Sequence, residues 1–250
     1  MFKVSGLSSN VLLEKVGKAM AGGVALSRDD EKAWERVQRR VRTLCEATAA
    51  AGGGILIDAE ESWIQDAIDA LAEDMMSDYN REQVVVYTTA QMYRHDRLAY
   101  LEGMAERAEE GGYACGVKLV RGAYMEKERE RAEKRGYLSP IQPDKASTDR
   151  DFDAAVAWVL ERLENVHLVA GSHNEESNLR LCELMAERGL EPGVSRVAFA
   201  QLLGMSDPNT LNRAATGYNA AKYVPYVPLP QLIPSLILRS SHHFRVGCQN

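Results

Sequence analysis

Two hydrophobic patterns alternate along this chain. Short runs rich in Val, Ile, Leu and Tyr predict β-strands. These runs cover residues 2–6, 55–59, 84–91, 116–121, 167–172, 196–201 and 221–224. Between them, apolar side chains recur every three or four positions, as in amphipathic helices. The clearest helical stripes are Ile64, Ile68, Leu71 and Met75; Leu98, Leu101, Ala105 and Ala108; Val156, Val159, Leu160 and Leu163; and Leu179, Cys182 and Met185.

Strands that alternate with helices predict an α/β fold with a parallel sheet covered on both faces. A weaker pattern between Tyr137 and Ser147 leaves room for an eighth strand. Seven or eight such units in 250 residues favour a single (β/α)8 TIM-type barrel, which we predict as one domain over residues 1–250. The alternative is a doubly wound sheet. Gly52-Gly53-Gly54 precedes its strand, however, whereas a dinucleotide-binding glycine turn would follow one.

Composition narrows the class of protein. A net charge of −6 makes a nucleic-acid partner unlikely on electrostatic grounds. The four cysteines lack any Cys-x-x-Cys pair, which favours free thiols in a reducing compartment. No apolar run reaches the roughly 20 residues of a membrane helix. We therefore expect a cytoplasmic protein that does not span a membrane.

Polar side chains close nearly every expected strand. In a barrel of this type, chemistry collects at the carboxyl ends of the strands. Burying such groups without partners would cost a few kcal/mol each, so their gathering predicts a functional site. Any one of them could instead form an ordinary loop salt bridge. These side chains are Lys3, Ser5, Asp58, Glu60, Gln91, Tyr93, Arg121, Ser172, His173, Gln201 and Tyr223.

The fourth strand carries two cations, and side-chain alternation places them on opposite faces. Arg121 shares a face with Val117 and Leu119, so we predict that Arg121 points into the barrel mouth. Lys118 is expected to snorkel toward the helix layer or pair there with an acid of the 126–128 run. Farther along, Asn174 is expected to cap a helix. A metal site at His173 is disfavoured because no second histidine stands at ligand spacing.

Six segments in order resemble the proline dehydrogenase family, whose members oxidise L-proline with FAD. They extend from Lys3 to Arg239, and the family's barrel is a distorted (β/α)8 fold that we expect to be N-terminally short here. The segments are Asp58-Ala59-Glu60, Gln91-Met92-Tyr93, Lys118 to Tyr124, Ser172 to Glu175, Phe199 to Met205 and Lys222 to Tyr226.

The resemblance implies a role for each matching residue. Arg121 would stand beside the flavin ring, where its charge stabilises the reduced form, and Asp58 would lie near the substrate; both are expected to be catalytic. The substrate-binding residues would be Lys3, Tyr223 and Arg239. The cofactor-binding residues, besides Arg121, would be Ala59, Gln91, Tyr124, Met125, Glu126, Ser172 and His173.

The implied reaction is hydride transfer from L-proline to FAD, which yields pyrroline-5-carboxylate in the first step of proline catabolism. A quinone or another acceptor would then receive the electrons, with peripheral contact at the inner membrane. Hydroxyproline is an equally compatible substrate.

Near its end the chain departs from the family pattern. Ser235 stands where a tyrosine is expected and Leu238 where the first of two substrate-clamping arginines is expected. This departure favours an alternative, a flavin-binding relative with impaired or no turnover. A third interpretation is a barrel lyase that forms a Schiff base on Lys3 or Lys118.

Overall fold

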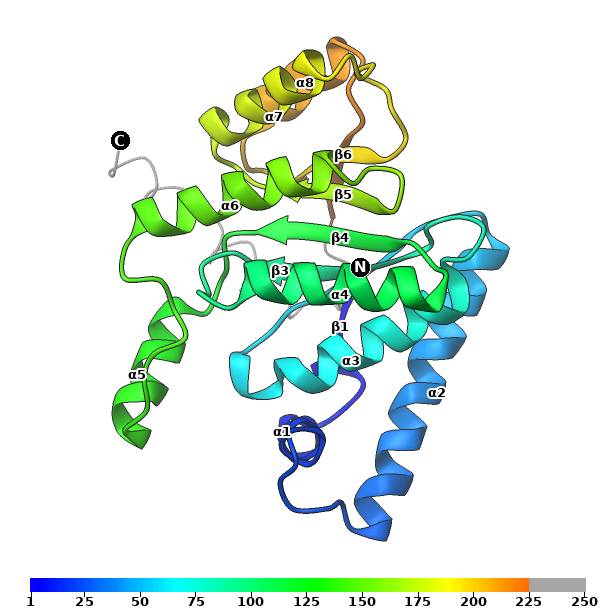
Figure 1. Ribbon diagram of the computed structural model, residues 1–250, viewed down its shortest axis with the longest axis vertical. Coiled ribbons are helices and arrows are strands. Elements are labelled where there is room, and N and C mark those ends of the chain that lie inside the picture. Colours follow the sequence, from blue (N-terminus) through cyan, green and yellow to red (C-terminus); the bar gives the residue numbers. More distant parts are fainter. Residues whose placement is uncertain (225–250) are drawn as a thin grey trace. The chain divides into compact units, whose positions relative to one another are not determined.

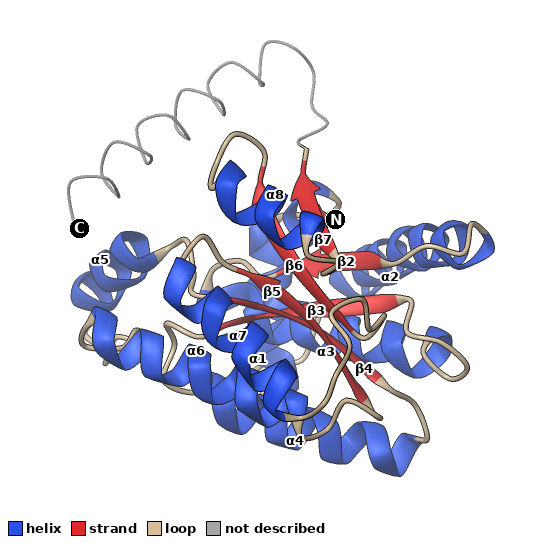
Figure 2. Cartoon of the chain, turned by 90° about the horizontal axis from the view of Figure 1, so that it is seen from above, coloured by secondary structure: helices blue, strands red, loops and turns tan. Residues whose placement is uncertain are grey.

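The computed structural model describes residues 1–224 (Figures 1 and 2). Arg239, Ser235, Leu238 and Cys248 therefore lie outside the described residues. The strands follow one another in chain order from β1 to β7. The ladders β1–β2, β2–β3, β3–β4 and β6–β7 are parallel. The predicted α/β alternation is confirmed.

The strand predictions hold to within a few residues, except that the first strand gives way at Val4 to a 3-10 turn. No helix within residues 1–224 is long and apolar enough to cross a membrane. The strands are β1 Phe2–Lys3, β2 Ile55–Asp58, β3 Val86–Gln91, β4 Cys115–Val120, β5 Val166–Gly171, β6 Val197–Leu202 and β7 Ala220–Tyr223. The helices are α1 Asn10–Met20, α2 Arg28–Ala50, α3 Ser62–Tyr79, α4 Arg97–Gly111, α5 Met125–Arg135, α6 Lys145–Leu160, α7 Glu175–Glu187 and α8 Asp207–Ala215.

The eighth strand proposed between Tyr137 and Ser147 is wrong. This segment forms a single antiparallel bridge, Arg94 to Ile141, and then enters α6 at the cap residue Asp144. The Asp144 carboxylate accepts a hydrogen bond from the Ser147 backbone N–H at 2.7 Å. A local cap, with a proline on either side of Ile141 and Gln142, thus ends the extended backbone after one bridge.

The chain divides into two compact units, residues 1–169 and 170–250. In the first unit, α1 and α2 pack on α3, and α4 lies along β3 and β4 (Figure 1). The predicted stripe of α3 is its core face, since Ile64, Ile68 and Leu71 are completely buried. The prediction that the units form one domain stays a prediction.

In the second unit, α8 packs on β6 and β7. The Phe199 ring meets Tyr218 edge-on at 5.5 Å between centroids. Asn174 caps α7 as predicted, because its side chain accepts from the Ser177 N–H at 2.9 Å. The apolar stripe predicted for α7 is wrong at Leu179, which is 57% exposed, whereas Leu181 is buried.

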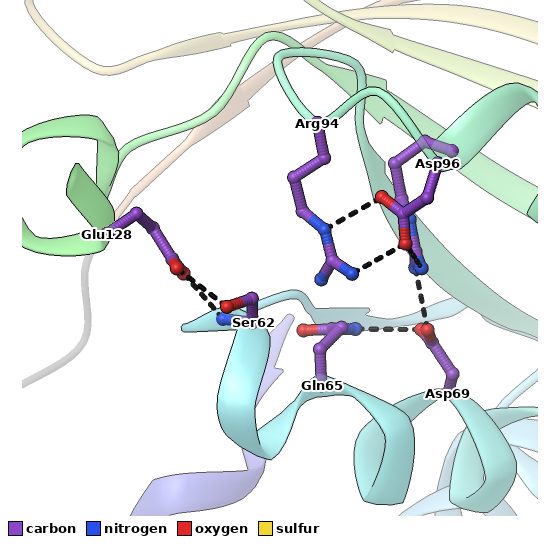
Figure 3. A network of polar contacts seen from close by, with 7 residues as sticks. Ser62, Gln65, Asp69, Arg94, Asp96 and Glu128 are labelled. Carbon is purple, nitrogen blue, oxygen red and sulfur yellow. Dashed lines mark hydrogen bonds and ion pairs between the residues drawn. The ribbon is translucent and has the colours of Figure 1, made fainter. Parts of the chain in front are cut away.

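A buried ionic network fixes the loop that follows β3 (Figure 3). Arg97 donates to Asp69 at 2.7 Å and to Asp96 at 2.5 Å. Arg94 also donates twice to Asp96, at 2.7 and 3.0 Å, and Gln65 donates to Asp69 at 2.7 Å. Helix α3 supplies Gln65 and Asp69, the loop supplies Arg94 and Asp96, and Arg97 begins α4. Charge therefore holds the segment after β3 against α3.

The substitution Asp96→Asn tests how much this network stabilises the protein, through the pH dependence of the free energy of unfolding. Burial raises the pKa of Asp96, but Arg97 and Arg94 outweigh it and lower the pKa from 3.8 to about 2. A carboxyl group whose pKa is lower in the folded than in the unfolded state stabilises the protein at pH values above its unfolded-state pKa. This stabilisation is lost as the pH falls through the folded-state pKa. In urea unfolding, wild type should therefore exceed Asp96→Asn in stability at pH 6, and the difference should shrink between pH 4 and 2. A difference that does not vary with pH would contradict this account.

Candidate functional site

Opposite charges face each other across the first two strands. Lys3 ends β1, Asp58 ends β2, and the two are direct partners in the parallel ladder. The Lys3 ammonium donates to the Tyr124 hydroxyl at 2.5 Å, across 121 residues of sequence. Tyr124 immediately precedes α5, so the turn after β4 returns to the end of β1. The structure thus brings three predicted site residues, Lys3, Asp58 and Tyr124, to one place.

The surroundings of Lys3 keep its side chain charged. Burial by itself lowers the pKa of Lys3. The hydrogen bond with Tyr124 and the negative charges of Glu60 and Asp58 outweigh burial, so the net pKa is raised. Lys3 is therefore suited to bind an anion and poorly suited to act as a neutral amine nucleophile.

Asp58 forms an ion pair with Lys118 of β4. The side chains are 15% and 9% exposed, respectively, so water screens the pair little. Lys118 also contacts the Met1 sulfur at 3.0 Å. Since β3 lies between β2 and β4 in the sheet, this pair crosses one whole strand. It places a second cation beside the charged ends of β1 and β2.

The predicted partner of Lys118 is wrong. Lys118 was expected to reach the helix layer, yet it pairs with Asp58, the last residue of β2. Arg121 directly follows the last residue of β4 and donates from Nε to Asp149 of α6 at 2.6 Å. That Arg121 points into the barrel mouth stays a prediction.

Arg121 is held firmly by α6. Its guanidinium carbon lies 4.4 Å from the centroid of the Phe152 ring. Asp149, its ion-pair partner, also accepts from Lys145 at 2.5 Å. Burial raises the pKa of Asp149, but the hydrogen bonds from Lys145 and Arg121 lower it further than burial raises it. The side chain of Arg121 is 21% exposed, so this cation borders solvent or a ligand.

The turn between β2 and α3 is fixed by buried polar contacts. Ala59 is buried, and Glu60 accepts from the Ser5 backbone N–H at 2.9 Å and from its hydroxyl at 2.5 Å. The Glu60 N–H donates to Gln65 at 2.8 Å. Ser5 and Gln65 therefore determine how Asp58 and Ala59 are presented.

Gln91 is the last residue of β3, and its side-chain oxygen is available to accept a hydrogen bond. Its side chain is 2% exposed, and within residues 1–224 its Oε1 atom has no hydrogen-bond partner. Close by, Gly122 has φ 148°, and a Cβ there would lie 2.4 Å from the Tyr93 ring. Tyr93 also accepts from the Tyr124 N–H at 3.2 Å. The turn after β4 therefore needs glycine and rests on the Tyr93 side chain.

Among the described residues, the second unit contains three of the predicted site residues. Ser172 and His173 directly follow β5, and the Ser172 carbonyl accepts from Asn178 and Gln201, both at 3.1 Å. Gln201 in turn accepts from Thr210 at 2.8 Å. Tyr223 is the half-buried last residue of β7. Buried amide groups thus fix the backbone that carries Ser172 and His173.

Sequence reasoning missed the ion pair of Lys118 with Asp58 and the supporting role of Tyr93. Both residues lay within predicted segments, but strand periodicity does not show which side chains meet across an intervening strand. Met125 and Glu126, assigned to a cofactor, begin α5 with exposed side chains. Nucleophilic thiols are not favoured in the first unit, because burial raises the pKa of Cys45 to about 11 and of Cys115 to about 12.

Comparison with known proteins identifies relatives. The family model described as proline dehydrogenase matches residues 3–240. The carbapenem antibiotics biosynthesis protein CarD of Pectobacterium carotovorum is 36% identical over 216 residues, which are 86% of this chain and 55% of that protein. Human mitochondrial proline dehydrogenase 1 is 34% identical over 217 residues, 86% of this chain and 36% of that protein. The chain thus spans between a third and about half of the length of these relatives.

A solved structure has the same fold. Proline utilization A of Bradyrhizobium japonicum, determined as a mutant, matches with a TM-score of 0.77 over 95% of this chain and 23% of that chain. The two sequences are 20% identical over the match, so this likeness concerns the fold.

The Asp58–Lys118 pair can be tested by a double-mutant cycle. Lys118→Met should lower the free energy of unfolding by about 3–5 kcal/mol, because it leaves a buried carboxylate without its counter-charge. Adding Asp58→Leu should recover most of the loss. Lys134→Met, which breaks an exposed pair with Glu130, should cost less than about 1 kcal/mol. Urea unfolding measures wild type, the single variants Lys118→Met and Asp58→Leu, the double variant and the control, and additive losses at positions 58 and 118 would refute the coupling.

Proposed function

Because the chain belongs to the proline dehydrogenase family, we propose that it oxidises L-proline to pyrroline-5-carboxylate with FAD as cofactor. Its whole activity, substrate and partners are part of this proposal, since the chain spans only part of its relatives.

The observation that carries the proposal is the pairing of opposite charges at the ends of β1 and β2. Free proline is a zwitterion whose carboxylate and ring ammonium are both attached to the α-carbon. Lys3 and Asp58, direct partners in the ladder, offer one cation and one anion at neighbouring positions. In our proposal the Lys3 ammonium binds the carboxylate and Asp58 lies on the side of the nitrogen.

The residues of the first unit suit a flavin. The spare Gln91 Oε1 is an acceptor that a ring N–H could use, and it is buried at the end of β3. The glycine turn at Gly122 brings backbone close to the same strand ends. We assign Gln91, Ala59 and the turn 121–126 to the cofactor. In the second unit we assign Ser172 and His173 to it as well.

FAD, when bound, supplies the acceptor for the hydride that leaves the carbon next to the proline nitrogen. The ring ammonium would first give one proton to solvent. As the C–H bond then breaks, the nitrogen lone pair would form the C=N double bond, and the resulting iminium would release its remaining N–H proton to solvent to give the cyclic imine. The chain's part is to hold the ring by its carboxylate and keep it oriented. Asp58 favours the positive charge that develops on the nitrogen.

Two cations have separate roles in this proposal. Lys118 balances the negative charge of Asp58 through the buried ion pair. Arg121, fixed by Asp149 and Phe152, is assigned to the flavin ring. The raised pKa of Lys3 argues against the lyase interpretation, which needs a neutral amine.

Tyr223 and Arg239 remain our candidates for the rest of the substrate pocket. A quinone or another carrier is the proposed electron acceptor, reached from the cytoplasm or at the inner membrane.

The visible spectrum tests the proposal directly. The purified protein should take up FAD and turn yellow, and anaerobic addition of L-proline should bleach it. A yellow protein that proline does not bleach would support the flavin-binding relative without turnover. Ser235→Tyr combined with Leu238→Arg should then restore bleaching. A colourless protein that refuses FAD would refute the proposal, and trapping by borohydride with a carbonyl compound would establish the lyase.

Lys3→Met tests carboxylate binding. A charge-assisted hydrogen bond is worth roughly 1.5–3 kcal/mol, so KM for L-proline should rise about ten- to a hundredfold. The matched control is Lys15→Met, whose lysine pairs with Asp30 at the surface and should leave KM unchanged. Steady-state dye reduction gives both constants. An unaltered KM in Lys3→Met would remove Lys3 from the substrate site.

A further inference from the structure

One buried carboxylate has no part in the proposed chemistry. Glu128 is 0% exposed, although it belongs to α5, a helix whose buried residues are Glu128 and Ala132. It accepts from the Ser62 backbone N–H at 2.5 Å and from the Ser62 hydroxyl at 2.6 Å (Figure 3). Burying a carboxylate is costly, so these bonds have to be specific and strong.

Glu128 acts as the cap of a different helix. Ser62 is the first residue of α3, and the formal cap residue Glu61 makes no side-chain cap bond. The first N–H groups of a helix need acceptors and favour negative charge. Glu128 meets both requirements from α5. It thereby fixes α5 to the start of α3, four residues after Asp58.

Glu128 also lies one helical turn after Tyr124, whose hydroxyl contacts Lys3, the residue proposed to bind the substrate carboxylate. The Glu128 N–H donates to the Tyr124 carbonyl at 2.9 Å, and the Tyr124 hydroxyl accepts from Lys3 at 2.5 Å. A continuous path of hydrogen bonds and helix backbone therefore runs from Ser62 through Glu128 and Tyr124 to Lys3. Any shift of α5 along α3 would carry the Tyr124 hydroxyl away from Lys3.

The other contacts of α5 with this region are weaker anchors. Lys127 pairs with Glu61, but its side chain is 57% exposed. Arg131 stacks on Trp63 at 4.1 Å and pairs with Glu14 at 2.8 Å, with both charged partners more than 20% exposed. Ion pairs open to water contribute little, so the buried cap dominates the placement of α5.

We propose that Glu128 is a positioning residue for substrate binding, which holds Tyr124 against Lys3 and so sets the affinity for the substrate carboxylate. This inference rests on the proposed function for its substrate, while the placement of Lys3 can be tested without it. Glu128 itself touches neither substrate nor cofactor in this proposal.

Glu128→Gln removes the charge and one acceptor with little change of shape. KM for L-proline should rise about tenfold while kcat stays within about twofold, because the loss falls on binding of the carboxylate. The matched control is Glu133→Gln, the same change at an exposed position of the same helix, which should alter neither constant. An unchanged KM, or a fall in kcat alone, would overturn the proposal.

A second measurement does not depend on turnover. Acetic anhydride acylates neutral amines, and the contact with Tyr124 helps to raise the pKa of Lys3. In Glu128→Gln, peptide mass spectrometry should find Lys3 labelled about three- to tenfold faster than in wild type. Tyr124→Phe should give the same increase, and the double variant should add nothing to it. Unchanged labelling in Glu128→Gln, or additive increases, would refute the path through Tyr124.

These readouts separate the two proposals. If wild type does not oxidise proline but Lys3 labelling rises in Glu128→Gln, the proposed function fails and the positioning of Lys3 by Glu128 stands. If proline is oxidised and labelling and KM do not respond, only the role of Glu128 fails. Should Glu128→Gln not fold, Ser62→Ala, which removes one of the two donors, should shift both readouts in the same direction by a smaller factor.

Discussion

The ion pair between Asp58 and Lys118 is the interaction on which the candidate site depends. A carboxylate at the end of β2 and an ammonium within β4, both mostly buried, are tolerated only because each neutralises the other. Because Asp58 pairs with Lys118, Lys3 donates its hydrogen bond to the Tyr124 hydroxyl. The strand ends then present charges that are fixed in place before any substrate arrives, which lowers the cost of ordering them on binding.

Much of this arrangement could be predicted from the sequence, because it depends on periodicity and on strand ends. All seven strands and the stripe of α3 follow from local patterns, and so does the cap at Asn174. The gathering of Lys3 and Asp58 follows from the rule that parallel strands end at one edge. These features are determined by residues close together in sequence or by the parallel topology alone.

The errors arose where distant residues decide the outcome. Alternation on β4 gives two faces but does not say which side chain meets Lys118, whose partner Asp58 stands 60 positions earlier in the chain. Asp149 and Phe152, which hold Arg121, lie about thirty positions farther along the chain. The eighth strand was predicted from a weak extended pattern, but the cap at Asp144 begins α6 within that segment. Glu128 had no visible signal, since it stands in a run of charges typical of an exposed helix.

Helix α5 is attached to the protein in an unusual way for a helix of eleven residues, because two of its side chains are buried and one of these is charged. Its attachment therefore depends on a few buried hydrogen bonds more than on buried apolar area, and a segment with so few buried apolar contacts opens locally at low cost. The helix is also rich in lysine and arginine, the residues after which trypsin cleaves. Limited digestion would thus reach this segment while the strands of the first unit remain folded, and a cut within α5 would separate Tyr124 from the part of the helix that follows the cut.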